Sequence, residues 1–431
     1  MPVITTDTAP TDTASTDTAS ISTTSTSTTS TSTATTSAVP ADTASVITPL
    51  LIEQMTQWRR HIHSLPECGF DVVHTAAFIA DKLESFGIEV VRDIGKSGVV
   101  GILRCGDGTA SIGLRADMDA LHIQEQNTFE YRSQHQGVMH ACGHDGHSAM
   151  LLGAASSLAA SRSFEGTVYF IFQPDEEHGK GAQAMIDDGL FERFQIDAVY
   201  GLHNLPGLPA GVFSIRPGSL MASESSFEIV LKGGGGHAAM PHVNADPLIA
   251  GAQVVLAIQA IVARQLSAID EPAVISVTEF ITNGTVNVIP SQVTIKGDCR
   301  CFTEAALDKI KAGLERVVSG ICQAADIEYD FELINSFYAL INSEIETQHA
   351  VNAASTALGE HNVISSCEPL TISEDFSSML KVKPGCYALM GNGTKSVGGC
   401  ALHNPHYDFN DHVLEKGVAY WIQLTHDQLK K

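Results

Sequence analysis

The chain alternates between helix-like and strand-like segments from Val46 onward, and this alternation is the feature that most restricts its fold. Two of the strand-like runs, Thr167–Gln173 and Asp197–His203, are short and apolar, as expected of strands buried on both sides. Further strands are predicted over 99–105 and 111–118, and helices over 53–63, 75–86 and 146–161. We therefore expect an α/β domain whose central sheet is covered by helices on both faces.

A second pattern begins near Ser219, with the order strand, helix, strand, strand, helix, strand. The strands are predicted over 225–233, 273–281, 292–302 and 327–333, and the helices over 246–267 and 303–324. This order is the signature of a ferredoxin-like unit. The residues after this unit again resemble the first α/β pattern. We therefore predict a catalytic α/β domain (46–218 and 335–431) with an inserted ferredoxin-like lid or dimerisation domain (219–334).

Residues 1–45 form a segment of different composition, dominated by Thr, Ser and Ala with near-repeats such as TDTAS. Between Thr5 and Ser45 there is no Lys, Arg, Leu or aromatic residue. Such a segment buries too little apolar surface to offset the entropy of ordering it. We expect a disordered tail without a catalytic role.

The charge balance is strongly acidic, with 25 Lys and Arg against 49 Asp and Glu, a net charge of −24. Phosphate binding draws on clustered Lys and Arg, so neither a nucleic acid nor an anionic membrane is expected as a partner. No apolar run approaches the roughly 20 residues that span a bilayer. The first residues lack a secretory signal, and the nine scattered cysteines contain no CxxC pair, so we expect a reduced, cytoplasmic address without disulfides.

The segment HACGHDGH (His140–His147) holds the densest group of metal-binding residue types. Cys142 and His144, two positions apart in a turn that leads into a helix, can point at one cation, and soft sulfur and imidazole ligands suit Zn²⁺ and related metals. A single Cys or His is more often structural. A whole cluster of this kind favours a metal site.

Acidic and imidazole side chains also end several predicted strands. Glu176 and Glu177 follow Thr167–Gln173, Asp119 follows the strand over 111–118, and His203 ends another. The acidic run alone would be interpreted as a solvated loop, but strand ends of an open α/β sheet share one edge, where ligands bind. One carboxylate can hold a metal while its neighbour accepts a proton.

Four further side chains are candidates for the site. His403 lies in LHNPHYDF, and His237 follows a run of four glycines, where a loop imidazole can donate to a developing oxyanion. Asn287 and Arg300 lie in the same predicted domain as His237, and the guanidinium fork of an Arg suits a substrate carboxylate. An exposed strand Arg is otherwise simply solvated.

Taken in order, the motifs RADMDAL, MHACGHDGHSAMLLGAA, FQPDEEH, GLHN, GGGGHAAMPH, NVIP, SEDF and LHNPHYDFND resemble one known family. It is the aminoacylase/hippurate hydrolase branch of the di-metal amidohydrolases and metallopeptidases, which includes hydrolases of auxin–amino-acid conjugates. The resemblance runs from about Gln57 to Asp411.

The resemblance implies a role for each matching residue. The ligands of two divalent metal ions (Zn, Mn or Co) would be Cys142, His144, Glu177, His203 and His403. It also implies that Glu176 is the general base, that Asp119 supports the metal site, and that His237 stabilises the transition state, usually across a dimer. Asn287 and Arg300 would hold the substrate's carboxylate.

The implied activity is metal-dependent hydrolysis of an N-acyl amino acid, a small molecule, by a homodimer or homotetramer. A dipeptidase or carboxypeptidase, a hydrolase of an aromatic or xenobiotic amide, and a non-catalytic metal-binding protein are the alternatives. Three residues depart from the family pattern, namely Asp175, His122 and His178. A carboxylate at Asp175 is expected to raise the pKa of the neighbouring base.

Overall fold

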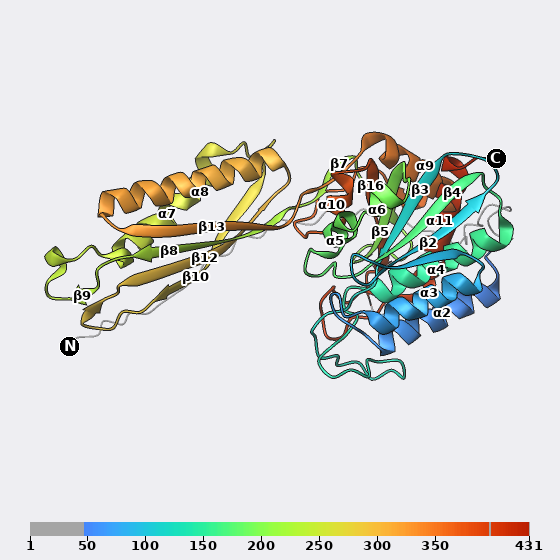
Figure 1. Ribbon diagram of the computed structural model, residues 1–431, viewed down its shortest axis with the longest axis horizontal. Helices are drawn as coiled ribbons and strands as arrows, with labels where there is room; N and C mark the ends of the chain where they lie inside the picture. The colour runs from blue at the N-terminus through green and yellow to red at the C-terminus, as the bar shows by residue number, and fades with distance from the viewer. Residues whose placement is uncertain (1–46, 396–397, 431) are drawn as a thin grey trace, which may run out of the picture. The chain divides into compact units, whose positions relative to one another are not determined.

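The computed structural model describes residues 47–395 and 398–430. The predicted tail, 1–45, lies outside these residues. An eight-stranded and a four-stranded sheet dominate the described chain, and two two-stranded sheets accompany them. Figure 1 labels most of their elements.

The larger sheet has eight strands in the order β1-β2-β4-β3-β5-β16-β6-β15. Its centre is parallel, since β3 pairs in parallel with β4 and β5, and β5 with β16. The strands are β1 (Glu89–Ile94), β2 (Gly98–Cys105), β3 (Ser111–Asp117), β4 (Gly166–Gln173), β5 (Ala198–Pro206), β6 (Phe213–Ser214), β15 (Val363–Ile364) and β16 (Gly385–Gly393). The carboxyl ends of β3, β4 and β5 therefore meet at one edge, as predicted.

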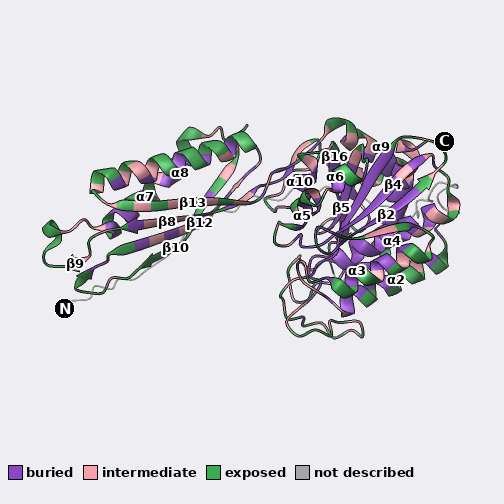
Figure 2. Ribbon diagram, in the orientation of Figure 1, coloured by how far each residue is buried: buried purple, intermediate pink, exposed green. Residues whose placement is uncertain are grey.

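Helices cover both faces of this sheet. Along β4, Phe170 and Phe172 join one core while Tyr169 and Ile171 join the other, which explains why the strand is apolar throughout. The first core is closed by α2 (Pro49–Ser64), α3 (Val73–Ser85), α4 (His144–Ser161), α9 (Glu344–Leu358) and α11 (Leu414–Gln428), and the second by α5 (Gly181–Asp187), α6 (Leu190–Arg193) and α10 (Phe376–Leu380). Figure 2 shows the central strands as the most buried part. The α/β prediction is confirmed.

The smaller sheet has four antiparallel strands in the order β10-β12-β8-β13. Together with α7 and α8 they give the predicted β-α-β-β-α-β order, with both helices packed on one face. The elements are β8 (Glu224–Lys232), α7 (Pro247–Gln265), β10 (Ala273–Thr282), β12 (Gln292–Cys301), α8 (Glu304–Ala325) and β13 (Glu328–Phe337). The last strand continues to Phe337, past the predicted boundary at residue 334, because Phe337 still pairs with Glu224.

Short elements complete the chain. Two segments connect the sheets, and they pair with each other as β7 (Gly218–Met221) and β14 (Leu340–Asn342). The others are β9 (Gly236–His237), β11 (Val288–Ile289), and the 3-10 turns η1 (Pro241–Val243), η2 (Glu360–Asn362) and η3 (Asp411–Val413).

Among the described residues, α7 is the single helix that is long and apolar enough, by length and composition alone, to cross a membrane. The expectation that no segment reaches that length is wrong for this helix. One side of α7 packs on the smaller sheet through Val254, Ile258 and Ile261, and this core packing accounts for part of its apolar composition. Its other side leaves Ile249 58% and Leu256 75% exposed.

Candidate metal centre and active site

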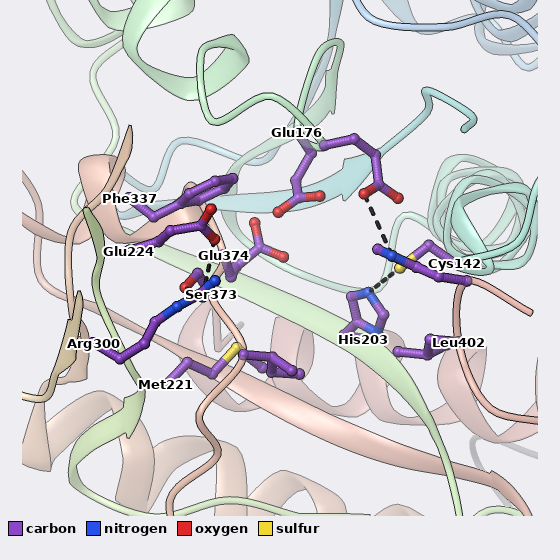
Figure 3. A pocket seen from close by; sticks show the side chains of 13 residues that line it. Cys142, Glu176, His203, Met221, Glu224, Arg300, Phe337, Ser373, Glu374 and Leu402 are labelled. Carbon is purple, nitrogen blue, oxygen red and sulfur yellow. Dashed lines mark hydrogen bonds and ion pairs between the residues drawn. The ribbon is translucent and has the colours of Figure 1, made fainter. Parts of the chain in front are cut away.

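Cys142 and His203 face each other at the edge of the larger sheet (Figure 3). The Sγ atom of Cys142 lies 3.4 Å from Nε2 of His203, and Nδ1 of His203 lies 2.6 Å from the backbone oxygen of Asn204. An imidazole whose Nδ1–H donates to a carbonyl presents the lone pair of Nε2, as metal-ligating histidines commonly do. His203 comes from β5, and Cys142 from the turn before α4.

His144 shows the same arrangement. Its Nδ1 lies 2.9 Å from the backbone oxygen of Asp119, while its Nε2 lies 3.8 Å from Oε1 of Glu177 and 3.9 Å from Oε2 of Glu176. The other oxygen of Glu177 lies 3.4 Å from Nε2 of His403. The structure thus brings together all five predicted ligands, Cys142, His144, Glu177, His203 and His403.

Buried polar atoms without partners indicate that this cluster fits metal ions. Nε2 of His144 and Oε1 of Glu177 are buried and make no hydrogen bond within the described part of the chain, a costly arrangement unless another group binds them. Burial raises the pKa of the Cys142 thiol, and the charges of Glu177 and Glu176 raise it further. A thiolate here therefore needs a neighbouring cation. Sulfur, imidazole and carboxylate donors together suit divalent Zn, Mn or Co.

The protonation of the histidines follows from their surroundings. Burial lowers the pKa of His144, but Asp117, Asp119 and Glu177 outweigh burial and raise it to about 10. Burial and the neighbouring His147 instead hold the pKa of His203 well below its usual range. A cation bound here would lower the pKa of His144 and would lower that of His203 further, so both rings would be neutral and able to act as ligands.

His147 lies in the same buried group of possible metal ligands as Asp117, His144 and His203. The backbone N–H of Asn204 donates to its Nε2 at 2.9 Å, so its Nδ1–H donates to Oδ1 of Asp117 at 2.6 Å. Both ring nitrogens are therefore engaged. The other oxygen of Asp117 accepts a hydrogen bond from Arg115 at 2.7 Å.

Asp119 positions the turn that carries Glu176 and Glu177 through hydrogen bonds to its backbone. Oδ1 and Oδ2 of Asp119 accept the backbone N–H groups of Glu176 and Glu177, both at 3.2 Å. Asp119 is buried and faces the main chain of the turn, which is consistent with the supporting role predicted for it.

Glu176 is the buried carboxylate next to the five ligands. Burial raises its pKa well above the usual range, and among the charges Glu374 contributes most, followed by Glu177. Asp175 was expected to supply this effect but points elsewhere, because its Oδ1 lies 2.6 Å from Nδ1 of His178. The third departure, His122, lies with its Nδ1 3.8 Å from Sγ of Cys68.

Sequence reasoning missed the network that positions Glu374. Arg115, fully buried on β3, donates to Glu374 Oε1 at 2.8 Å and to Asp375 Oδ1 at 3.1 Å. Tyr387 on β16 donates to the other oxygen of Glu374. The available signals were the SEDF motif, which contains both acids, and the Arg of RADMDAL.

A pocket of about 450 Å³ extends from the metal ligands to the base of the smaller sheet (Figure 3). The lining residues include Cys142, Glu176, Glu177, His203, His403, Glu374 and, at the opposite end, Arg300. The predicted substrate-binding Arg300 is therefore in reach of the same cavity as the predicted base.

The structure does not bring His237 and Asn287 to this pocket. They are neighbours on β9 and the turn before β11, where the N–H of Ala238 donates to the oxygen of Asn287 at 3.0 Å. Both are exposed, and neither lines the pocket of its own chain.

The model of peptidase family M20/M25/M40 matches residues 113–427, nearly three quarters of the chain. The chain belongs to this family. A hippurate hydrolase of Campylobacter jejuni is 40% identical to this M20 protein over 372 residues, which is 86% of this chain and 96% of the relative. An Arabidopsis thaliana protein, IAA-amino acid hydrolase ILR1-like 4, is 35% identical over 85% of this chain and 84% of its own.

The solved structures agree with this assignment. The Bacillus subtilis protein YXEP, described as a dinuclear metal-binding peptidase of the M20 family, has a TM-score of 0.76 and 30% identity to this chain. The match covers 88% of this chain and 99% of YXEP. The family resemblance inferred from the motifs is thus confirmed, as are the fold and the binding of divalent metal ions that it implied. The assignment of individual side chains as ligands stays a prediction.

Proposed function

We propose that this M20 protein hydrolyses the amide bond of N-acyl amino acids to a carboxylic acid and a free amino acid. One observation carries the proposal: a buried carboxylate, Glu176, lies beside five metal-ligand side chains in a pocket whose other end holds Arg300. The names of the relatives, a hippurate hydrolase and an IAA-amino acid hydrolase, support this substrate class.

Glu176 moves the proton in the proposed reaction. Its carboxylate takes a proton from the attacking water and returns it to the amide nitrogen as the C–N bond breaks. The five predicted ligands would hold two divalent ions, which would supply Lewis acidity for the water and the carbonyl. Arg300 orients the substrate's carboxylate, and Asp119 keeps the Glu176 turn in place through the two backbone hydrogen bonds.

The decisive experiment compares wild type with Glu176→Gln after loading with Zn²⁺, Mn²⁺ or Co²⁺. N-acetyl, N-benzoyl and indoleacetyl amino acids are offered, and amine release is measured. We expect turnover by wild type and a loss of about 10²- to 10⁴-fold in the variant, with unchanged metal content by elemental analysis. Equal activity of the variant contradicts the assignment of the base. Turnover that requires a free α-amino group on the acyl side instead identifies a dipeptidase.

We also propose a homodimer, in which His237 and Asn287 act in the pocket of the partner subunit. Their exposure on the smaller sheet, away from their own pocket, supports this arrangement. The exposed apolar side of α7, with Ile249 and Leu256, offers a contact surface. Co-expression of His237→Ala with Glu176→Gln tests it, because a mixed dimer regains one complete site whereas independent monomers stay inactive. A single monomeric mass in light scattering contradicts the proposal.

We further propose a cytoplasmic location. All nine cysteines lie within the described chain and carry free thiols, which supports a reducing compartment. Fractionation of source cells with an antibody to the chain tests the location.

A further inference from the structure

Arg300 is already held by carboxylates of its own chain. Its Nη1 lies 2.9 Å from Oε2 of Glu224, and its Nε lies 3.0 Å from Oδ2 of Asp298. Nη1 also donates to Oγ of Ser373 at 2.9 Å, which fixes the guanidinium against the larger domain. One positive charge is thus shared by two negative charges, so this end of the pocket carries a surplus negative charge.

The other residues that line the pocket do not neutralise the surplus negative charge near Arg300. Among the described residues that line it, Arg300 is the only Lys or Arg. Glu374 pairs with Arg115, which does not line the cavity and is also shared with Asp117 and Asp375. Glu177 belongs to the metal cluster at the other end. Glu224 therefore offers a carboxylate to whatever enters the distal end.

Glu224 is accessible and rigidly placed. Its side chain is 35% exposed, so it accepts a new partner without a full desolvation cost. Its backbone pairs with Phe337 at the base of the smaller sheet, and the preceding Ser223 N–H donates to the oxygen of Cys301 at 2.7 Å. The carboxylate is therefore anchored on paired strands rather than on a free loop.

The surfaces around Glu224 suit an aliphatic stem. The apolar side chains of Met221 and Phe337 lie at the end of the pocket that holds the ion pair (Figure 3), and Ile372 also lines the cavity. The side chains of Lys and Arg combine an apolar stem with a charged tip, and they bury the stem while the tip reaches a polar partner. A cationic side chain is thus complementary both to the apolar lining and to the carboxylate at its end.

Resting on the proposed function, we infer that Glu224 selects N-acyl amino acids whose amino-acid part carries a cationic side chain. In the complex, the substrate's α-carboxylate binds Arg300 while its side-chain ammonium or guanidinium binds Glu224. The substrate thereby replaces the internal ion pair of Arg300 and Glu224 with two intermolecular pairs of the same kind.

The test compares kcat/KM for N-benzoyl-L-lysine with that for N-benzoyl-L-norleucine, which has the same stem without the ammonium. We expect the metal-loaded wild type to prefer the lysine substrate by about tenfold, and Glu224→Gln to bring the ratio close to one. The matched control is Asp298→Asn, which also removes a carboxylate partner of Arg300, but one that does not line the pocket. It is expected to keep the preference for lysine.

Two results overturn the inference. One is a wild-type ratio of one or less. The other is an equal loss for both substrates in Glu224→Gln, which would mean that Glu224 only positions Arg300. If no N-acyl amino acid is hydrolysed, the proposed function fails. The inference about Glu224 is then tested separately, by calorimetry that compares the binding of free L-lysine with that of L-norleucine to the metal-loaded protein. Tighter, Glu224-dependent binding of lysine supports the inference, and equal binding refutes it.

Discussion

The carboxylate of Asp119 accepts the backbone N–H of Glu176 at 3.2 Å, and its second oxygen accepts that of Glu177 at the same distance. One side chain therefore sets the position of both the predicted base and a predicted metal ligand. The backbone oxygen of Asp119 also lies 2.9 Å from Nδ1 of His144. Asp119 links three functional residues without lining the pocket itself.

Replacing Asp119 by Asn is expected to disturb both functions at once. The amide NH₂ faces a backbone N–H where an oxygen is needed, so one of the two hydrogen bonds is lost and the turn shifts. We expect a loss of about 10- to 100-fold in metal affinity or kcat/KM. Metal titration and kinetics on the purified variant measure these effects. Asp175→Asn is the control, because the carboxylate of Asp175 bonds His178 and not the Glu176 turn. Unchanged metal affinity and turnover in Asp119→Asn would contradict the linking role of Asp119.

Removing the charge of Glu374 is expected to change the pH dependence. After burial, Glu374 is the largest influence that raises the pKa of Glu176. Without that negative charge the pKa of Glu176 falls, so the ionised base persists to lower pH. The acidic limb of the kcat/KM profile of Glu374→Gln should therefore move toward lower pH. A limb that stays in place, or moves upward, shows that another group controls the acidic side.

Stability is expected to depend on pH through the buried His63. Its Nδ1 lies 2.9 Å from Asp145 and its Nε2 3.3 Å from Glu125. Burial lowers the pKa of His63, but these carboxylates outweigh burial and raise it to about 9. Because the folded-state pKa exceeds the unfolded value, the stabilisation is fully present below pH 6.5 and is lost as the pH rises through about 9.

His63→Gln tests this dependence in metal-saturated protein by chemical unfolding. At pH 6 the variant is expected to lose about 3–5 kcal/mol of unfolding free energy, since one partner of a buried ion pair is removed. At pH 10 the loss should be smaller. His61→Gln, on the same helix, is the control, because burial lowers the pKa of His61 instead. An equal loss at both pH values contradicts a charged His63.

The sequence predicts the parts of this protein that local patterns encode. Strand β4 follows directly from its short apolar run, and helix α8 from the helix-like pattern over 303–324. The five predicted ligands lie in short motifs: Glu177 follows β4, His203 lies in β5, Cys142 lies just before α4 and His144 begins it, and His403 lies in a loop. Arg115 and Glu374 both lie in recognisable motifs, but the sequence does not show that their side chains pair, because they are 259 residues apart and come together only in the folded chain.

Other features depend on more than the local sequence of one chain. The positions of His237 and Asn287 away from the pocket follow from where the insertion places β9 and β11. The pairing of Arg300 with Glu224 depends on the start of β8 and the end of β12 lying side by side. The sequence alone does not show which carboxylates form ion pairs with an Arg on a strand.

Gly143 allows the tight turn that positions Cys142, and substitution of Gly143 is expected to remove metal binding. The residue has a φ of 93°, and a Cβ there would lie 2.2 Å from Nδ2 of Asn204 and 2.5 Å from the hydroxyl of Tyr407. Gly143→Ala therefore moves Cys142 away from His203. Gly137→Ala is the control, because its φ of 77° gives similar backbone strain while nothing lies within 4 Å of the added methyl group. We expect the control to cost about 1–2 kcal/mol and to keep its metal, whereas Gly143→Ala loses both metal and turnover. Equal metal content in the two variants would show that the close approach to Asn204 does not position the ligand.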